Sequence, residues 1–438
     1  MKTRNYTIIL LVLSLYSLFI LTERFLSKSL LISGSISIII TAGIYFISKN
    51  YLLHLQRVKT IHFFGIIIFY TAITTPLIHE MDQLNDYEKR IPAPFPKFEA
   101  SNIWAFPKGL KAYFNDAFAF RNTLIKSHIK VQTEIFDVSP NPQSVSISKD
   151  NWLFFVPKNY IEQCSKPLTE DELDKIVDNL KFKKKFLNDR GIKFYLTIPP
   201  IKAHFYKEKL PHRLQLSFKH SKLDQLTKHL KKYPEINFID LDTVLKQHKK
   251  IMKIYYQSDT HWNKLAAFYA YQAIMKRIIN DFPQLSYLKL DDMIVKEIEM
   301  QGGDLNDILG DPTLFPKSGY SVLRRGGEKA VKVKPNDFLS KIPRLSQELI
   351  INENKNVNNK LKLCVFRDSF TEYLYPHFSE NFARSSYPWR RDISAKYIIH
   401  EQPDIVIHEL LERFIFKMVD LPLDFKVYQN IMVTDKVK

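Results

Sequence analysis

The sequence predicts an α/β fold with a doubly wound, mainly parallel sheet, preceded by N-terminal transmembrane helices. Two observations lead to this prediction. Three uncharged apolar runs occupy most of the first eighty residues, and beyond them short β-rich runs alternate with longer amphipathic ones. Such alternation is typical of a parallel sheet covered by helices on both faces, and ligands bind these sheets at the carboxyl ends of the strands.

The apolar runs cover residues 6–22, 30–48 and 63–78. Each is close to the length that a helix needs to cross about 30 Å of hydrocarbon, and a cleaved signal peptide would show one run rather than three. Lys and Arg gather at the N-terminus and in the loop at 49–59, so the positive-inside rule places both in the cytoplasm. Residues 1–80 are therefore predicted to form about three spans of a multi-pass protein of the cytoplasmic membrane. The rest of the chain would face the periplasm or the extracellular side, unless one run is a buried or re-entrant helix.

The chain after the apolar runs divides into a linker and one α/β domain. Residues 81–145 are rich in proline at first and then become helical near 110–131, which predicts a juxtamembrane segment. The domain is expected at 146–425. Its first long helix, at 169–191, begins with a Thr followed by acidic residues and ends near a Gly, as capped helices do. The other expected elements are strands at 192–200, 236–241, 361–366 and 404–410 and a helix at 263–281.

The charge and the cysteines indicate little about function. The formal net charge of +18 could suggest an anionic partner. The lysines are spread along the chain, however, and no basic run alternates with aromatic residues, so nucleic acid is not an expected partner. Cys164 and Cys364 fit no metal-binding spacing, and the sequence leaves open whether they form a disulfide.

A serine follows one of the expected buried strands. Asp368 and Ser369 come directly after the strand at 361–366, which would place the serine at the ligand-binding edge of the sheet. A helix that begins there would point backbone N–H groups at the same place, where they could stabilise an oxyanion. Serine is a weak nucleophile, so it needs a base within hydrogen-bonding reach and a third group that orients the base.

The segment "SDTHWN" (258–263) contains both of these groups. Asp259 stands two residues before His261 and can accept the second imidazole N–H within one loop. We predict Ser369 as the nucleophile, His261 as the general base and Asp259 as the group that orients it. Both motifs have a simpler interpretation as helix caps, with a histidine at the surface. A metal site is a third interpretation, but no HExxH motif or further ligand is evident, so neither a metal nor another cofactor is predicted.

Taken in order, several segments resemble the alginate O-acetyltransferase family, the AlgJ/AlgX-like group with an SGNH-hydrolase-like domain. The two catalytic blocks would be "SDTHWN" and "VFRDSF". The other matching segments are "FNDAFAFRNTLIK" (114–126), "SKDNWLFF" (148–155), "YLTIPPIKAHFYKEKLP" (195–211), "GGDLNDILG" (302–310) and "QPDIVIHELLERF" (402–414). The resemblance covers the chain from about residue 110 to about residue 415.

This resemblance implies a permuted SGNH arrangement, in which the Asp-x-His block precedes the Ser block. It also implies transfer of acetyl groups to hydroxyls of an exopolysaccharide or cell-envelope glycan, through an acetyl-serine intermediate at Ser369. The implied partners are the polysaccharide acceptor and a multispanning membrane acyltransferase that supplies the acetyl group. One departure concerns Arg367, which stands where the family usually has Gly.

Four residues are predicted to contact the substrate. Trp262 and Trp389 could stack on sugar rings, although packing in the core is the common alternative for tryptophan. Arg390 belongs to the aromatic and basic segment at 385–392, and Arg367 could donate to an oxyanion or to an anionic glycan.

Two other functions fit the same sequence. A glycan acetyl esterase would use the same three residues, because water and a sugar hydroxyl compete for the same acyl-enzyme. A non-catalytic subunit that binds glycan, or acts as a scaffold in an export complex, would account for the Arg in place of Gly at the Ser block.

Overall fold

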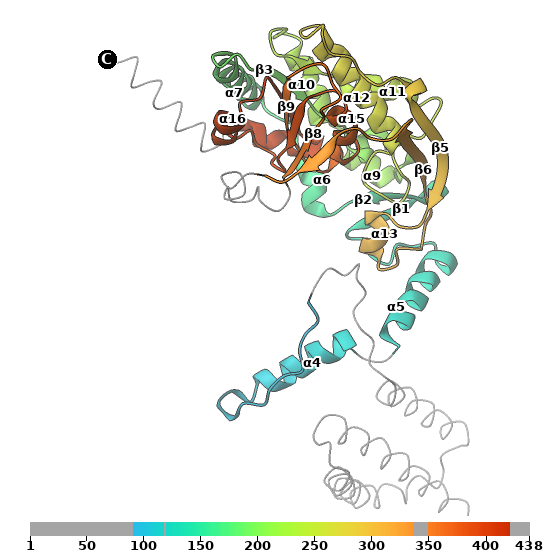
Figure 1. The fold of residues 1–438 in the computed structure, drawn as a ribbon. Helices are drawn as coiled ribbons and strands as arrows, with labels where there is room; N and C mark the ends of the chain where they lie inside the picture. The colour runs from blue at the N-terminus through green and yellow to red at the C-terminus, as the bar shows by residue number, and fades with distance from the viewer. Residues whose placement is uncertain (1–90, 118–119, 336–348, 421–438) are drawn as a thin grey trace, which may run out of the picture. The chain divides into compact units, whose positions relative to one another are not determined.

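The computed structural model describes residues 91–117, 120–335 and 349–420 (Figure 1). The packing divides the chain between Val131 and Gln132 into two compact units. The first contains helices α4 (Ala105–Ala117) and α5 (Arg121–Lys130). A single helical stretch was predicted here, but Phe120 has a left-handed backbone with φ 64°, which an L-residue helix does not continue through.

The predicted transmembrane region lies outside the described residues, so the three spans stay a prediction. Within the described ranges, no helix combines the length and the apolar character that crossing a bilayer requires.

The second unit is built on a seven-stranded sheet (Figure 1). Its strands, in spatial order, are β4 (Phe238–Ile239), β3 (Lys193–Thr197), β11 (Ile405–Glu409), β9 (Lys362–Phe366), β10 (Arg384–Tyr387), β8 (Ile350–Glu353) and β7 (Val331–Val333). The first five strands run parallel, whereas β8 and β7 are antiparallel to their neighbours. The predicted α/β fold is therefore confirmed. The antiparallel edge was not predicted, and β4 is shorter than the strand expected at 236–241.

The two central strands are almost entirely buried, which explains why their sequences are continuous apolar runs rather than alternating ones. In β9, Cys364, Val365 and Phe366 have no exposed surface, and every residue of β11 is buried. Neighbouring strands on both sides and packing on both faces leave only Lys362, at the start of β9, partly exposed.

Helices surround the sheet and form one continuous core with it. Helix α7 (Glu170–Asn188) packs against β3 and begins with a complete capping box, in which Thr169 and Glu172 bond to each other's backbone N–H. Helix α12 (Lys264–Ile279) is capped by the side chain of Asn263. The other α-helices among the described residues of this unit are α6 (Lys158–Ser165), α8 (Lys202–Phe205), α9 (His212–Ser217), α10 (Lys222–Leu230), α11 (Leu241–His248), α13 (Asp304–Leu309), α15 (Tyr375–Ser379) and α16 (Ala395–Glu401).

Two hairpins and two short helices complete the parts that position the site. The hairpins are β1 (Val145–Ser148) with β2 (Trp152–Phe155) and β5 (Met293–Met300) with β6 (Lys317–Arg324). The short 3₁₀ helices η8 (Ser369–Tyr373) and η9 (Glu412–Val419) follow β9 and β11.

Cys164 and Cys364 are both free thiols in the core, so the question that the sequence left open has an answer: they do not form a disulfide. Burial raises the pKa of Cys164 to about 12 and that of Cys364 well above its usual value. Such thiols are unreactive in the folded protein, because the thiolate is the nucleophile.

Candidate active site

The carboxyl ends of neighbouring parallel strands meet at one edge of the sheet, and Ser369 lies there as the first residue of η8. Asp368 caps this helix, since its carboxylate accepts the backbone N–H of Phe370 at 3.0 Å. The other carboxylate oxygen accepts the N–H of Leu411, beyond β11, at 2.9 Å. The N-cap role that the sequence allowed thus belongs to Asp368, which leaves the Ser369 hydroxyl for other contacts.

The Asp-Thr-His segment lies in the loop between α11 and α12. Lys202, just after β3, holds this loop because its ammonium donates to the backbone carbonyls of Gln257 at 2.7 Å and Asp259 at 3.0 Å. Lys202 is buried, and burial lowers its pKa to about 7. Because α12 begins three residues after His261, the loop, the lysine and the helix set the direction of the imidazole together.

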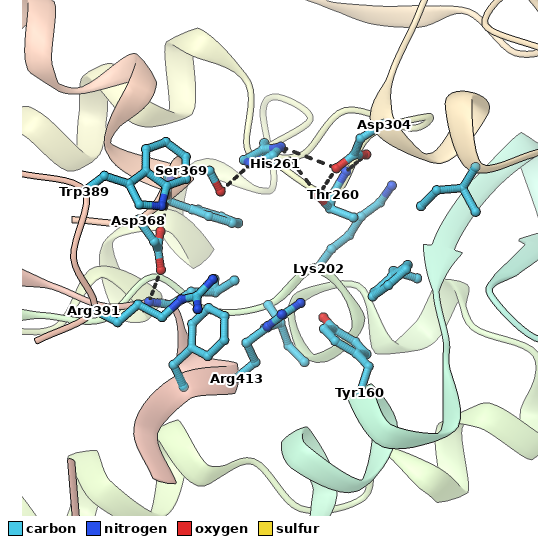
Figure 2. Close-up of a pocket in the computed structure, with 16 residues that line it drawn as sticks. Tyr160, Lys202, Thr260, His261, Asp304, Asp368, Ser369, Trp389, Arg391 and Arg413 are labelled. Carbon is cyan, nitrogen blue, oxygen red and sulfur yellow. Dashed lines mark hydrogen bonds and ion pairs between the residues drawn. The ribbon is translucent and has the colours of Figure 1, made fainter. Parts of the chain in front are cut away.

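The three predicted catalytic side chains form one hydrogen-bonded chain. Nε2 of His261 lies 2.8 Å from Oγ of Ser369, which Figure 2 shows as a dashed line. Nδ1 of His261 lies 2.7 Å from Oδ1 of Asp259, and the same oxygen accepts the His261 backbone N–H at 2.9 Å. A carboxylate on Nδ1 leaves Nε2 as the nitrogen that faces the serine, which is the geometry that a nucleophile, a base and an orienting acid require.

The carboxylate of Asp259 is held in its charged form. Burial opposes the charge, but the hydrogen bond and charge of His261, together with Lys317, outweigh burial and hold the pKa of Asp259 well below its usual range. Nζ of Lys317, at the start of β6, lies 2.5 Å from Oδ2 of Asp259. Lys317 was not predicted as a site residue, because nothing in its local sequence links it to a loop 58 residues earlier.

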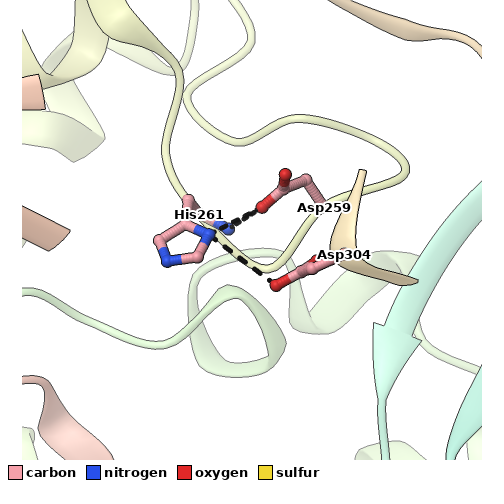
Figure 3. A group of neighbouring side chains, drawn as sticks. All are labelled: Asp259, His261 and Asp304. Atoms are coloured by element: carbon pink, nitrogen blue, oxygen red, sulfur yellow. Dashed lines mark hydrogen bonds and ion pairs between the residues drawn. The ribbon is translucent and has the colours of Figure 1, made fainter. Parts of the chain in front are cut away.

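A second carboxylate, Asp304 at the start of α13, also faces this loop (Figure 3). It accepts the backbone N–H of Thr260 at 2.7 Å and lies 3.7 Å from Nδ1 of His261. Burial disfavours the imidazolium, but Asp259 and then Asp304 outweigh burial and raise the pKa of His261 above its usual value. The sequence indicates the segment "GGDLNDILG" only through the family resemblance, and no local pattern marks Asp304 as a neighbour of His261.

Asp259, His261 and Asp304 offer ligand atoms within 4.8 Å of one another, the one such group among the described residues. Two contacts disfavour a cation there. Lys317 places a positive charge on the free oxygen of Asp259, and Nδ1 of His261 is engaged with the other oxygen. A divalent ion would have to displace both, so these residues fit a hydrogen-bonded triad better than a metal site.

A cavity of about 240 Å³ opens beside Ser369 and His261 (Figure 2). Its walls come from the segments after β3, β9, β10 and β11 and from α13. The lining residues are Phe155, Tyr160, Ile201, Lys202, Thr260, His261, Asp304, Ile308, Asp368, Ser369, Phe370, Trp389, Arg391, Leu411, Arg413 and Phe414. Its size suits a short acyl group and part of an acceptor rather than a long ligand.

Two arginines that face this cavity were not predicted. The guanidinium groups of Arg391 and Arg413 lie over the ring of Phe414, at 3.9 Å and 4.3 Å from its centroid. Within the described part of the chain, neither forms an ion pair. The Nε–H of each is a buried donor without a partner among the described residues, in two side chains that line the same cavity as Ser369.

Trp389 and Arg390, both predicted to contact substrate, differ in position. Trp389 is half-buried and lines the cavity, as a sugar-stacking residue would need to. Arg390 does not line it, and its neighbour Arg391 does. The cavity thus has its basic residue in this segment one position later than Arg390, and a substrate contact by either arginine stays a prediction.

Trp262 and Arg367 do not contact the cavity, so the predicted substrate contacts of these two residues are corrected. Trp262 is completely buried, and its Nε1 donates to the carbonyl of Phe370 at 3.1 Å, which ties the histidine loop to η8. Arg367 is 1% exposed, with its guanidinium 4.5 Å from the ring of Trp389. Both residues pack against residues that line the cavity, Phe370 and Trp389, and do not line it themselves.

Comparison with known proteins confirms the resemblance that the sequence suggested. Residues 145–337 match the family model described as an SGNH hydrolase-like domain, acetyltransferase AlgX. The matched range contains Asp259, His261 and Asp304 and ends before Ser369. No match was found among curated proteins.

Three solved structures are similar over much of the chain. Bacillus cereus PatB1 is 18% identical, with a TM-score of 0.49 over 64% of this chain and 99% of the other. The O-acetyltransferase domain of Pseudomonas putida AlgJ is 18% identical, with a TM-score of 0.41 over 64% and 94%. Pseudomonas aeruginosa AlgX is 12% identical, with a TM-score of 0.38 over 63% and 67%. None of these TM-scores reaches 0.5, so the function proposed below rests on the family match and on the geometry of the site.

Proposed function

From the match of residues 145–337 to the AlgX-type SGNH hydrolase-like acetyltransferase domain, we propose that this protein is a serine-dependent O-acetyltransferase. It transfers an acetyl group to a hydroxyl of an exopolysaccharide or cell-envelope glycan. The observation that supports this most directly is the chain from Ser369 Oγ to His261 Nε2 at 2.8 Å and from His261 Nδ1 to Asp259 at 2.7 Å.

In the first half of the reaction, Ser369 Oγ attacks the carbonyl carbon of the acetyl donor while His261 Nε2 takes the hydroxyl proton. Asp259 stabilises the imidazolium that forms. The tetrahedral intermediate then collapses, the bond from the acyl carbon to the donor oxygen breaks, and His261 gives its proton to the leaving group. The product is acetyl-Ser369 with neutral His261.

In the second half, a glycan hydroxyl attacks the acetyl-serine. His261 takes the proton of this hydroxyl, the ester bond to Ser369 breaks, and the proton passes to Ser369 Oγ. The acetylated glycan leaves and the free enzyme is restored. Water in place of the glycan hydroxyl would give acetate, so exclusion of water by the filled cavity decides between transfer and hydrolysis.

Stabilisation of the oxyanion needs hydrogen-bond donors beside Ser369. Among the described residues, the backbone N–H of Ser369 has no acceptor, whereas those of Asp368 and Phe370 donate to Glu409 and Asp368. We infer that the Ser369 N–H donates to the oxyanion. Arg391, whose side chain faces the same cavity, is a second possible donor.

The proposed setting is outside the cytoplasm. In this proposal residues 1–80 span the membrane, residues 81–145 connect, and residues 146–425 form the catalytic domain on the periplasmic or extracellular side. The acetyl group would come from a multispanning membrane acyltransferase partner. The basis for this location is the predicted orientation of the apolar runs. A topology reporter fused after residue 90 tests the location. Reporter activity on the cytoplasmic side of the membrane would contradict the proposal.

The test of the chemistry uses the full-length protein with a chromogenic acetyl ester, next to the Ser369→Ala and His261→Ala variants. We expect each variant to lose at least about 1,000-fold of the turnover, as in other serine triads. Intact-mass measurement on the wild type should show one added acetyl group, absent from Ser369→Ala.

The other functions give different results in the same assay. If the protein hydrolyses the ester, and added glycans neither speed the reaction nor become acetylated, the protein is an esterase. A folded wild type that neither turns over nor becomes acetylated would contradict the enzyme proposal and favour a glycan-binding subunit.

A further inference from the structure

A second cavity, of about 360 Å³, lies next to the same two catalytic segments. It shares no lining residue with the first. Lys264, three residues after His261, forms part of its wall, and so does Tyr373, at the end of the short helix that begins with Ser369. The remaining walls come from α15 and from the hairpin of β5 and β6, which contribute the apolar side chains of Met293 and Val322.

One wall of the cavity is formed by the largely buried side chain of His377. His377 is 8% exposed and packs edge-on against Phe268, with ring centroids 5.0 Å apart. Within the described residues, no group forms a hydrogen bond with either of its ring nitrogens. Burial, together with Lys264, lowers the pKa of His377 to about 4, so at neutral pH the ring offers one N–H donor and one acceptor. Neither ring nitrogen is among the fully buried polar atoms that lack a partner in the described residues, so the ring of this cavity-lining residue keeps its donor and acceptor accessible to a ligand.

The charges around the cavity balance. Arg324 pairs with Glu380, and Glu372 pairs with the buried Arg367 at 3.3 Å. The two remaining charged groups in the wall, Lys264 and Glu328, have opposite signs. An anionic ligand would therefore meet no surplus of positive charge. An uncharged polar ligand fits these walls better.

We propose that the second cavity is a glycan subsite that binds an uncharged sugar unit of the acceptor chain. His377 exchanges hydrogen bonds with a sugar hydroxyl, and the ring of Tyr373 packs against the apolar face of the sugar. This inference deepens the proposed function, on which it rests for the identity of the ligand as an acceptor glycan. Because both catalytic segments continue into the cavity, a chain held there is positioned relative to Ser369.

The test measures binding rather than catalysis. The full-length Ser369→Ala variant is titrated calorimetrically with tetrasaccharides of β-1,4-linked glucose, of N-acetylglucosamine and of galacturonate. We expect one of the neutral tetramers to bind more tightly than the uronate. Adding His377→Phe, which keeps the ring packing and removes both polar nitrogens, should weaken that binding about tenfold. Adding His377→Gln, which keeps a donor and an acceptor, should retain most of the affinity.

The matched control is His248→Phe in the same Ser369→Ala background, because His248 stacks on Tyr269 and lines neither cavity. Its affinity should equal that of the parent. Three outcomes overturn the proposal: equal affinity with and without His377→Phe, tightest binding of the uronate, or binding of none of the tetramers. If His377→Phe fails to fold, the proposal is still tested by the affinity of the His377→Gln variant and by the comparison of neutral with acidic tetramers. Failure of the separate ester assay would contradict the proposed enzyme, not this site.

Discussion

His261 lies between two carboxylates and one ammonium group. Asp259 bonds to its Nδ1, Asp304 is 3.7 Å from the same nitrogen, and Lys317 holds Asp259 from the other side. The catalytic proton transfer requires neutral His261, so activity rises as the pH rises through the pKa of this residue. Since that pKa is raised, the rise should occur at higher pH than for a free histidine.

Replacement of Asp304 should move this rise. Asp304→Asn removes a negative charge that stabilises the imidazolium, so the pKa of His261 falls and the rise in kcat/KM moves to lower pH. The amide can still accept the N–H of Thr260, which keeps the loop in place. The profile of kcat/KM against pH for the chromogenic ester measures the shift. An unchanged profile would mean that Asp304 acts only through the backbone.

Replacement of Lys317 should move the rise in kcat/KM in the opposite direction, to higher pH. The charge of Lys317 lowers the pKa of His261, so Lys317→Met should raise that pKa and move the rise to higher pH. Opposite shifts in these two variants would establish that charge sets the profile, since a loosened loop would change both in the same direction. The thermal melt of each variant serves as the control for folding.

At the scale of elements, the site depends on turns that bring separate segments into contact. Gly303, just before α13, has φ 123°, and a Cβ on it would lie 2.2 Å from the carbonyl oxygen of Ser258. The neighbouring Gly302 also has a positive φ, 104°, but a Cβ there would have open space. Substitution at Gly302 therefore tests backbone strain alone, whereas substitution at Gly303 adds a steric clash with the loop that carries Asp259.

Gly303→Ala should lower stability more than Gly302→Ala. Both substitutions strain the backbone, but only the first pushes the loop at Ser258 away, at an added cost of about 1–3 kcal/mol. Ester turnover should fall further in Gly303→Ala, because the displaced residue precedes Asp259. Chemical denaturation and the ester assay measure the two effects. Equal losses in both variants would contradict the contact with Ser258.

The capping box of α7 allows a second test at this scale. Thr169→Ala removes the side-chain oxygen that accepts the N–H of Glu172 at 3.2 Å, and should cost about 1 kcal/mol. The control is Lys175→Ala on the same helix, whose exposed ion pair with Asp171 contributes little. A loss no greater than that of the control would show that the cap does not stabilise the helix.

At the scale of the whole molecule, the core encloses both thiols. Cys164 and Cys364 have no exposed surface, so a thiol reagent should modify neither in the native protein and both after unfolding in denaturant without reductant. The number of modified thiols, measured by intact mass, checks this. Reaction of either cysteine in the folded protein would contradict the structure. So would unfolded protein whose two cysteines react only after a reductant is added, because that result would indicate a disulfide.

Local patterns were sufficient for several predictions. The strand before Ser369, the cap of α7 and the helix after His261 were predicted from runs of adjacent residues, whose backbone preferences and burial act over short distances. The Asp259 and His261 pair was recognisable because both residues sit in one loop. The roles of Ser369, His261 and Asp259 remain predictions that the ester assay tests.

Other features depend on segments far apart in the sequence. Lys202, Asp304 and Lys317 reach the histidine loop from three different places, and no local pattern marks them as partners of Asp259 or His261. Trp262 was predicted to face substrate but is buried against η8, since the packing of two distant segments determines which side of a residue meets solvent.

By itself, the sequence determined that this chain forms an α/β domain with a serine after one buried strand and a histidine before one helix. Periodicity and capping are local properties, so they can be recognised without knowing the fold. Only the tertiary structure decided that serine and histidine lie 2.8 Å apart, that Arg391 rather than Arg390 faces the cavity, and that His377 lines a second cavity with no hydrogen bond to its ring from the described residues. Ser369 and His261 are 108 residues apart in the sequence, and such contacts depend on packing, which involves the whole set of neighbours at once.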